Sequence, residues 1–202
     1  MGQRKNAGRT ATLAAMALGL AFVTVRGRGR TADDRLFARL NSGIQRPGLD
    51  RFFRSITELG SLWASVGAAA AMTAVGRKRE ATDALAAAVV TWAAGQGLKR
   101  AFGRLRPYEV AGHDHRLLID RPAGASWPSS HPAVLLTFVT VAGRDLGVGS
   151  GARSGLDMLA GAVGISRIYL GVHYPADVAG GLLLGRAVAN FWTTSVSRRV
   201  LR

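Results

Sequence analysis

The stretch from Ser166 to Asp177 reads SRIYLGVHYPAD and places a guanidinium, an imidazole and a carboxylate on one short segment. Proline is favoured at the first position of a helix, so Pro175 predicts a helix that starts there. Asp177 then lies in the first turn, four residues after His173, and its carboxylate can reach a ring nitrogen of that histidine. A histidine oriented in this way keeps its other nitrogen free to act as a base or a nucleophile. Arg167 adds a permanent planar charge that suits phosphate oxygens.

Two other stretches carry residues of the same chemistry. Lys99 and Arg106-Pro107 stand with six residues between the lysine and the arginine, and Pro128–His131 (PSSH) adds a second histidine in a serine-rich turn. Each block alone has a structural explanation: a basic membrane flank for the first, and helix caps for Ser129 and Asp177. The order and spacing of all three blocks favour one common site.

Uncharged runs separated by basic or glycine-rich turns predict helices that cross a membrane. No period-2 strand pattern and no internal repeat is present, so the predicted fold is all-α, with five to six transmembrane helices. After an apolar run at residues 11–25, the predicted spans are Leu59–Gly76, Ala84–Leu98, Pro132–Gly143, Ser154–Gly171 and Val178–Ser197.

The three blocks resemble, in this order, the signature motifs of the type 2 phosphatidic acid phosphatase superfamily, which are K-x6-R-P, P-S-G-H and S-R-x5-H-x3-D. The sequence matches every motif position except Ser130, where the family usually has glycine. If the backbone there had a positive φ, serine would cost more than glycine. The resemblance covers roughly residues 59–197 and implies an integral-membrane lipid phosphatase with its site at the extracytoplasmic helix ends.

The chemistry of the blocks, and the resemblance, imply the same roles. His173 attacks phosphorus to form a phosphohistidine, Asp177 fixes its tautomer, and His131 protonates the leaving oxygen and then activates water. Cations supply the electrostatic stabilisation, so neither a metal nor another cofactor is expected. The residues expected to bind the substrate phosphate are Lys99, Arg106, Ser129, Ser130 and Arg167.

The composition limits the partners. The formal net charge of +15 comes from 27 Lys and Arg against 12 Asp and Glu, which indicates nucleic acid, anionic lipid or phosphate as a partner. Aromatic residues are only 7% of the chain and no zinc-finger or RNA-recognition signature occurs, which argues against nucleic acid. The lack of cysteine excludes disulfides and thiolate metal sites. The expected partners are a lipid phosphate or diphosphate substrate and membrane lipids.

One further cluster holds metal-binding residue types. His113, Asp114 and His115 follow one another in a polar loop over residues 108–127. This pattern resembles a metal site, but a solvated loop is the favoured interpretation.

The N-terminal part precedes the motifs. Residues 11–25 follow a basic start, as in a signal peptide, but no small-x-small cleavage site precedes Arg26, so a retained membrane helix is favoured. Apolar stripes over residues 26–54 predict amphipathic helices that lie on the membrane surface or pack on the bundle. Three parts of a single domain follow: the N-terminal helices at 1–58, the phosphatase core at 59–197 and a basic tail at 198–202.

The basic turn Arg77–Glu80 suits the cytoplasmic side, so with six spans the motifs face the outside of a cell or inner membrane. The sequence RGRGR at residues 26–30 would then lie outside, against the positive-inside tendency. Asp157, Arg167 and Arg186 interrupt the last two spans, and buried charges of this kind face a bundle interior. The sequence suggests no task for Arg186.

Three functions are compatible with these features. The first is hydrolysis of a phosphate or diphosphate from a polyprenyl lipid or a glycerophospholipid. The second, a vanadium-haloperoxidase-like enzyme, would use a similar pocket, but those enzymes are soluble and larger. The third is a non-catalytic membrane protein whose basic face binds anionic lipid. Residues 26–58 and 108–127, where the head group would bind, carry no motif that selects one lipid.

Overall fold

The structure, a computed structural model, describes residues 2–42, 46–110 and 115–196. All regular secondary structure in these ranges is helical, which confirms the all-α prediction. The α-helices are α1 (Gly2–Ala21), α2 (Arg30–Ser42), α3 (Pro47–Thr57), α4 (Leu62–Ala74), α5 (Lys78–Phe102), α6 (Ser130–Asp145), α7 (Ser150–Tyr169) and α8 (Pro175–Phe191). The short helical turns are η1 (Phe22–Arg26), η2 (Glu58–Gly60), η3 (Pro107–Glu109) and η4 (Trp192–Val196).

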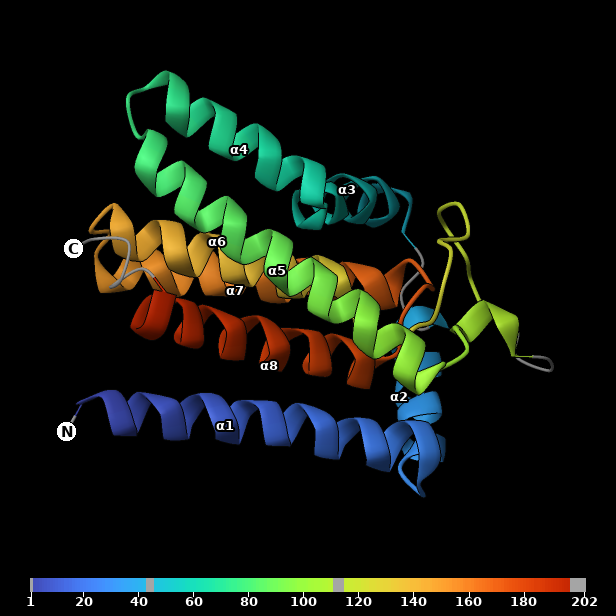
Figure 1. Cartoon of the computed structure of the whole chain (residues 1–202). Coiled ribbons are helices and arrows are strands. Elements are labelled where there is room, and N and C mark those ends of the chain that lie inside the picture. Colours follow the sequence, from blue (N-terminus) through green and yellow to red (C-terminus); the bar gives the residue numbers. More distant parts are fainter. Residues whose placement is uncertain (1, 43–45, 111–114, 197–202) are drawn as a thin grey trace.

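Helices α4 to α8 form an elongated bundle, and α1 lies along α8 (Figure 1). Helix α2 crosses one end of the bundle, where α5 and α7 end and α6 and α8 begin, and the connection from α5 to α6 projects from this end. The start of α1, the α4–α5 connection and the end of α8 lie at the opposite end. The connection from α5 to α6, which contains the polar loop, and the basic turn Arg77–Glu80 between α4 and α5 are therefore at opposite ends of the bundle.

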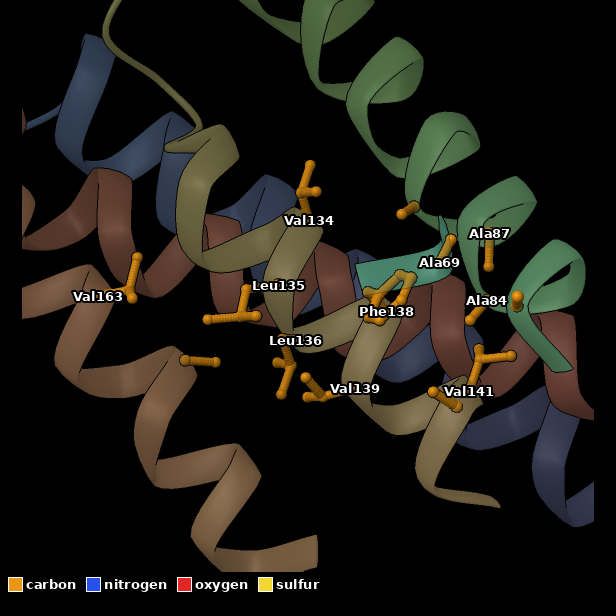
Figure 2. Packing of buried hydrophobic residues seen from close by; sticks show 14 residues of the cluster. Ala69, Ala84, Ala87, Val134, Leu135, Leu136, Phe138, Val139, Val141 and Val163 are labelled. Carbon is orange, nitrogen blue, oxygen red and sulfur yellow. The ribbon is translucent and has the colours of Figure 1, made fainter. Parts of the chain in front are cut away.

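The main apolar core is centred on α6, which is buried along most of its length. Its side chains point toward three neighbouring helices, and small alanines on α5 allow that helix to approach closely (Figure 2). The labelled members are Val134, Leu135, Leu136, Phe138, Val139 and Val141 of α6, Ala84 and Ala87 of α5, Ala69 of α4 and Val163 of α7.

Two of the charged residues inside the later helices, Arg186 and Asp157, pair with each other. Arg186 of α8 contacts Asp157 of α7 at 2.6 Å and donates to Thr140, which gives the arginine the task that the sequence did not suggest. Among the described residues, one segment, Asn6–Arg26, is long and apolar enough to cross a membrane by length and composition alone. The other long helices carry charges that lower their hydropathy, and several of these charges are neutralised by partners on adjacent helices.

Helices α2 and α3 pack on the bundle at the loop end. Phe37 of α2 is fully buried, and its ring lies 5.3 Å from that of Tyr174. Asn41, also fully buried, donates to the carbonyl of Tyr169 at 2.9 Å and accepts from the N–H of Arg116. In α3, Phe53 stacks on Tyr169 at 4.4 Å between ring centroids. The N-terminal segment thereby buttresses the ends of α7 and α8.

Two adjacent glycines bring α8 against the turn that precedes α6. A Cβ on Gly180 would lie 2.5 Å from the indole nitrogen of Trp127, and a Cβ on Gly181 would collide with the carbonyl oxygen of Ser129. A backbone contact cannot be relieved by a change of rotamer. The PSSH turn and the first turns of α8 are therefore fixed relative to one another by the absence of side chains.

We expect Gly181→Ala to destabilise the fold by about 1–3 kcal/mol, because the added methyl group must displace backbone atoms. Gly161→Ala is the matched control, since a Cβ at that helical position has no neighbour within 4 Å. The measurement is the midpoint of thermal unfolding in detergent. Equal midpoints for the two variants would contradict the close packing of α8 on the Ser129 turn.

Candidate active site

The three motif segments meet at the loop end of the bundle. Lys99 lies in the last turn of α5, His131 in the first turn of α6 and Arg167 in the last turn of α7. His173 lies in the turn before α8, and Asp177 in the first turn of that helix. The structure thus brings all eight predicted site residues to one place, the remaining members being Arg106, Ser129 and Ser130.

Local sequence explains how these side chains reach the site. Helix α5 ends at Gly103, which adopts the left-handed conformation with φ +57° and donates its N–H to the carbonyl of Lys99. Helix α8 begins at Pro175, and the N–H of Tyr174 donates to the carboxylate of Asp177 at 2.9 Å. Asp177 therefore caps the N-terminus of α8. This contact fixes its carboxylate beside the turn that holds His173.

The imidazole of His173 is 2% exposed and has two different sides. Its Nδ1 lies 3.4 Å from Asp177 Oδ2 and 3.4 Å from the hydroxyl of Ser126. Its Nε2 lies 3.3 Å from the guanidinium of Arg106. Burial lowers the pKa of His173 well below its ordinary value, against the opposing effect of Asp177. The ring is neutral at neutral pH, with Nε2 toward the cations.

Three buried cations lie at this end of the bundle: Lys99, Arg106 and Arg167 are 8%, 3% and 3% exposed, and Arg106 is the one in contact with His173 Nε2. Lys99 donates to the carbonyl of Ala125 at 2.7 Å, and Arg167 donates to the hydroxyl of Thr57 at 3.0 Å. Within the described ranges, none of the three forms an ion pair with a carboxylate. Buried charges without a counter-ion are costly, so this arrangement favours the binding of an anion.

Arg106 is fixed by carbonyl oxygens. Its Nε donates to Gly124 at 2.8 Å, its Nη1 to Val172 at 3.1 Å and its Nη2 to Ala123 at 3.3 Å. Burial lowers the pKa of this guanidinium from its usual value. Three of the five N–H groups are thus used for orientation, a fourth faces His173 Nε2, and one on Nη2 remains for a ligand.

Several buried polar atoms near the cations have no hydrogen-bond partner among the described residues: Ser129 Oγ, Ser130 Oγ and Arg167 Nε. Buried hydroxyl and guanidinium groups are normally paired. Both serines stand at the N-terminus of α6, where backbone N–H groups and the helix dipole also favour negative charge. These atoms supply the donors that a tetrahedral oxyanion requires.

His131 stands apart from the carboxylates. Its ring makes no hydrogen bond to any described residue, and the η2 turn packs on it so closely that a Cβ on Gly60 would lie 2.7 Å from His131 Cβ. The two histidines therefore differ in environment. His173 is held by Asp177 and Ser126, whereas no hydrogen bond to a described residue holds the ring of His131.

The H-D-H cluster can be followed only in part. His113 and Asp114 lie outside the described residues, and the ring of His115 packs edge-on against Phe37 with centroids 4.6 Å apart. Across residues 2–42, 46–110 and 115–196, no group of three or more His, Cys, Asp or Glu is placed to hold a metal ion.

The model of the PAP2 superfamily matches residues 80–201, which include all three motifs. The chain belongs to the PAP2 superfamily. The predicted resemblance is therefore confirmed. The chain is 32% identical over 151 residues to a decaprenylphosphoryl-5-phosphoribose phosphatase of Mycobacterium tuberculosis, covering 72% of this chain and 79% of the relative. It is 43% identical over 63 residues, 31% of each chain, to the putative undecaprenyl-diphosphatase YbjG of Escherichia coli.

Two solved PAP2 structures share the fold. The transmembrane PAP2-type phosphatidylglycerolphosphate phosphatase of Bacillus subtilis superposes with a TM-score of 0.74 at 24% identity, over 96% of this chain and 98% of the other. LpxE of Aquifex aeolicus superposes with a TM-score of 0.69 at 29% identity, over 79% and 93%. The prediction that this PAP2 chain is a phosphate-ester hydrolase is confirmed by its relatives.

The deviation from the PAP2 motif at Ser130 causes no backbone strain. No described residue other than glycine has a positive φ, so serine costs nothing on that account. Its side chain lies beside Gly95 of α5, where an added Cβ would lie 3.4 Å from Ser130 Oγ, at an ordinary contact distance.

Sequence reasoning missed four residues that support the PAP2 site: Asp33, Thr57, Arg104 and Ser126. Arg104 stands inside the block for which a basic membrane flank is an alternative explanation, but its guanidinium is buried and contacts Asp177 Oδ1 at 2.7 Å. Asp33 lies outside the three motifs, in the N-terminal part of the chain. Ser126 and Thr57 stand in segments without a motif. Each acts through a partner far away in the chain, so local spacing carries no signal for them.

We expect Arg106→Lys and Arg167→Lys each to lower kcat/KM by at least about tenfold, or about 1.4 kcal/mol. A lysine retains the charge but loses the planar fork that contacts several oxygens at once. The matched control is Arg100→Lys, because Arg100 is exposed in the last turn of α5. Hydrolysis of p-nitrophenyl phosphate by the purified variants provides the measurement. Wild-type kinetics in both site variants would show that these arginines do not hold the phosphate.

Proposed function

We propose that this protein is a membrane lipid phosphatase that hydrolyses a phosphate or diphosphate from a lipid through a phosphohistidine on His173. The observation that carries the proposal is the group of three buried cations without carboxylate partners among the described residues, one of which, Arg106, contacts His173 Nε2. The unpaired hydroxyls of Ser129 and Ser130 provide further support. Together these groups provide the charges and donors that bind an oxyanion.

In the first step, the lone pair on His173 Nε2 attacks phosphorus, the N–P bond forms, and the bond from phosphorus to the leaving oxygen breaks. His131 gives its proton to that oxygen. The proton on His173 Nδ1 stays between the ring and Asp177, which stabilises the positive charge that develops on the imidazole. Arg106, 3.3 Å from the attacking nitrogen, and the other cations neutralise the charge on the transferred group.

In the second step, His131 removes a proton from water, and the resulting hydroxide attacks the phosphohistidine. The N–P bond breaks, inorganic phosphate is released, and Nε2 of His173 regains its lone pair. His131 thus ends each cycle with the proton it began with. A diphosphate substrate follows the same path, with the lipid monophosphate as leaving group.

The relatives support a polyprenyl phosphate as the substrate class. The mycobacterial relative is named for a decaprenyl-linked phosphosugar, and the Escherichia coli relative for an undecaprenyl diphosphate. We therefore propose polyprenyl phosphates or diphosphates ahead of glycerophospholipids. Release of inorganic phosphate from such a lipid by purified protein separates this function from a haloperoxidase-like enzyme and from a non-catalytic lipid-binding protein.

We propose that the protein spans the membrane several times, with its active site at the outer face. Helix α5 has 25 residues and is therefore about 37 Å long, enough to cross a hydrocarbon core of about 30 Å. It joins the basic turn at Arg77–Arg79 to the site at Lys99. The basic turn belongs on the cytoplasmic side, which places the site outside.

Single cysteines at Asp120 and Lys78 test this topology, because both positions are exposed and the native chain has no cysteine. An impermeant maleimide should label Asp120→Cys in intact cells, and Lys78→Cys only after the membrane is opened. The cysteine-free protein measures background. Labelling of both positions from outside would contradict the proposed orientation.

The two histidines should respond differently to the leaving group. His173→Ala should abolish turnover of every substrate, because each needs the nucleophile. His131→Ala should lose about 10²–10⁴-fold on an alkyl phosphate, whose alkoxide must be protonated. With p-nitrophenyl phosphate the loss in the first step should be much smaller, since nitrophenolate leaves without a proton. This variant should then accumulate phosphoenzyme and give a burst of nitrophenol.

Rapid-quench kinetics of both variants on both substrates makes this measurement. Each variant must first elute as folded protein in detergent, with the wild type as reference. A burst from His173→Ala, with none from His131→Ala, would reverse the assignment of nucleophile and acid.

A further inference from the structure

A buried guanidinium bridges two carboxylates directly behind the proposed nucleophile. Arg104 is 6% exposed, and its Nη1 lies 2.7 Å from Asp177 Oδ1 while its Nη2 lies 2.7 Å from Asp33 Oδ2. The guanidinium also stacks on the ring of Tyr174, with 4.0 Å between Cζ and the ring centroid. Planar stacking and two ion pairs leave this side chain one orientation.

Asp33 reaches this cluster from α2. Its other oxygen, Oδ1, accepts the N–H of Ala176 at 2.9 Å, so a carboxylate from a distant helix caps the first turn of α8. Asp33 therefore contacts both Arg104 and the helix that carries Asp177. The cluster Asp33–Arg104–Asp177 ties α2 and the segment after α5 to the start of α8.

Both carboxylate oxygens of Asp177 therefore have partners. Oδ1 is occupied by Arg104, while Oδ2 accepts from Ser126 Oγ and from the N–H of Tyr174 and lies 3.4 Å from His173 Nδ1. The main chain of Arg104 contributes as well, because its carbonyl accepts the N–H of Ser126 at 2.7 Å. The carboxylate cannot rotate without breaking several of these contacts, so only Oδ2 is presented to the imidazole.

The charge of Arg104 has a second consequence. An isolated buried carboxylate would be a strong proton acceptor, because burial disfavours its charged form. An adjacent guanidinium stabilises the anion and opposes transfer of the Nδ1 proton from His173. The imidazolium that forms during attack is then stabilised while its proton stays on the ring.

We propose that Arg104, supported by Asp33, is a positioning residue for the phosphoryl-transfer step. It acts through Asp177 and does not touch the phosphate. This inference rests on the proposed phosphohistidine function and adds a third arginine role to the site. Arg106 and Arg167 bind the substrate, whereas Arg104 orients the nucleophile's partner.

The test separates phosphate binding from phosphoryl transfer. Arg104→Lys keeps a positive charge but reaches only one of the two carboxylates. We expect its rate of phosphoenzyme formation from p-nitrophenyl phosphate to fall at least about tenfold, as expected from misplacement of a reacting group. Competitive inhibition by inorganic phosphate, which tests the cation site without a bond to the nucleophile, should stay within about threefold of wild type. Arg100→Lys, on the exposed side of the preceding helix turn, should match the wild type in both assays.

Asp33→Asn gives a second, independent measurement and remains informative if Arg104→Lys does not fold. It keeps the oxygen that accepts from Ala176 but loses the ion pair. We expect a smaller loss, about threefold or more, again in phosphoenzyme formation and not in inhibition by inorganic phosphate.

The outcomes are distinguishable. A wild-type phosphorylation rate in folded Arg104→Lys or in Asp33→Asn would overturn the positioning role. Parallel losses of phosphate inhibition and rate would also overturn it, since they would place Arg104 in phosphate binding or in general stability. Absence of any phosphoenzyme in the wild type would overturn the proposed function, and the positioning role with it.

Discussion

The decisive physical constraint in this protein is the burial of three like charges at one helix-bundle end. Lys99, Arg106 and Arg167 repel one another and have lost most of their water. Neutral oxygens, such as the carbonyl of Gly124 and the hydroxyl of Thr57, orient two of these cations without cancelling their charge. A carboxylate in the same place would stabilise the empty protein but would compete with the substrate. The burial of these unpaired charges therefore lowers the stability of the protein locally and favours the binding of an oxyanion.

The carboxylates of Asp177 and Asp33 lie close to these cations, but on the Nδ1 side of His173. Asp177 and Asp33 are both paired with Arg104, so they do not neutralise the phosphate-binding cations. The imidazole therefore lies between an uncompensated positive region at Nε2 and a balanced polar region at Nδ1. This separation explains why the segment after α5 carries two arginines so close together. One of them, Arg106, is the residue that we propose to bind the anion. The other, Arg104, pairs with Asp33 and Asp177, so these carboxylates do not neutralise the cations.

The parts of this structure that sequence predicts are those set by local spacing. Pro175 predicts the start of α8 and hence the reach of Asp177 to His173, and the order of the motifs predicts that their residues meet. The role of Arg104 could not be predicted, because its partner Asp33 is 71 residues away and an R-x-R pattern does not tell which arginine is buried. Mean hydropathy likewise understates how apolar the helices of the bundle are. Arg186 and Asp157 each lower the mean hydropathy of their own helix, although the two charges neutralise each other.

Ser130 shows how a motif can change without loss of the site. Thr91, Gly95 and Lys99 follow one another at intervals of four residues, so they share one face of α5, and all are buried. Thr91 on this face hydrogen-bonds Thr137 of α6 at 2.9 Å, and one turn later Gly95 lies beside the hydroxyl of Ser130. The next residue on the same face is Lys99 itself. The extra hydroxyl therefore packs against α5 one helical turn before Lys99, the cation that we propose to bind phosphate, and the altered turn carries one hydroxyl more than the usual motif provides.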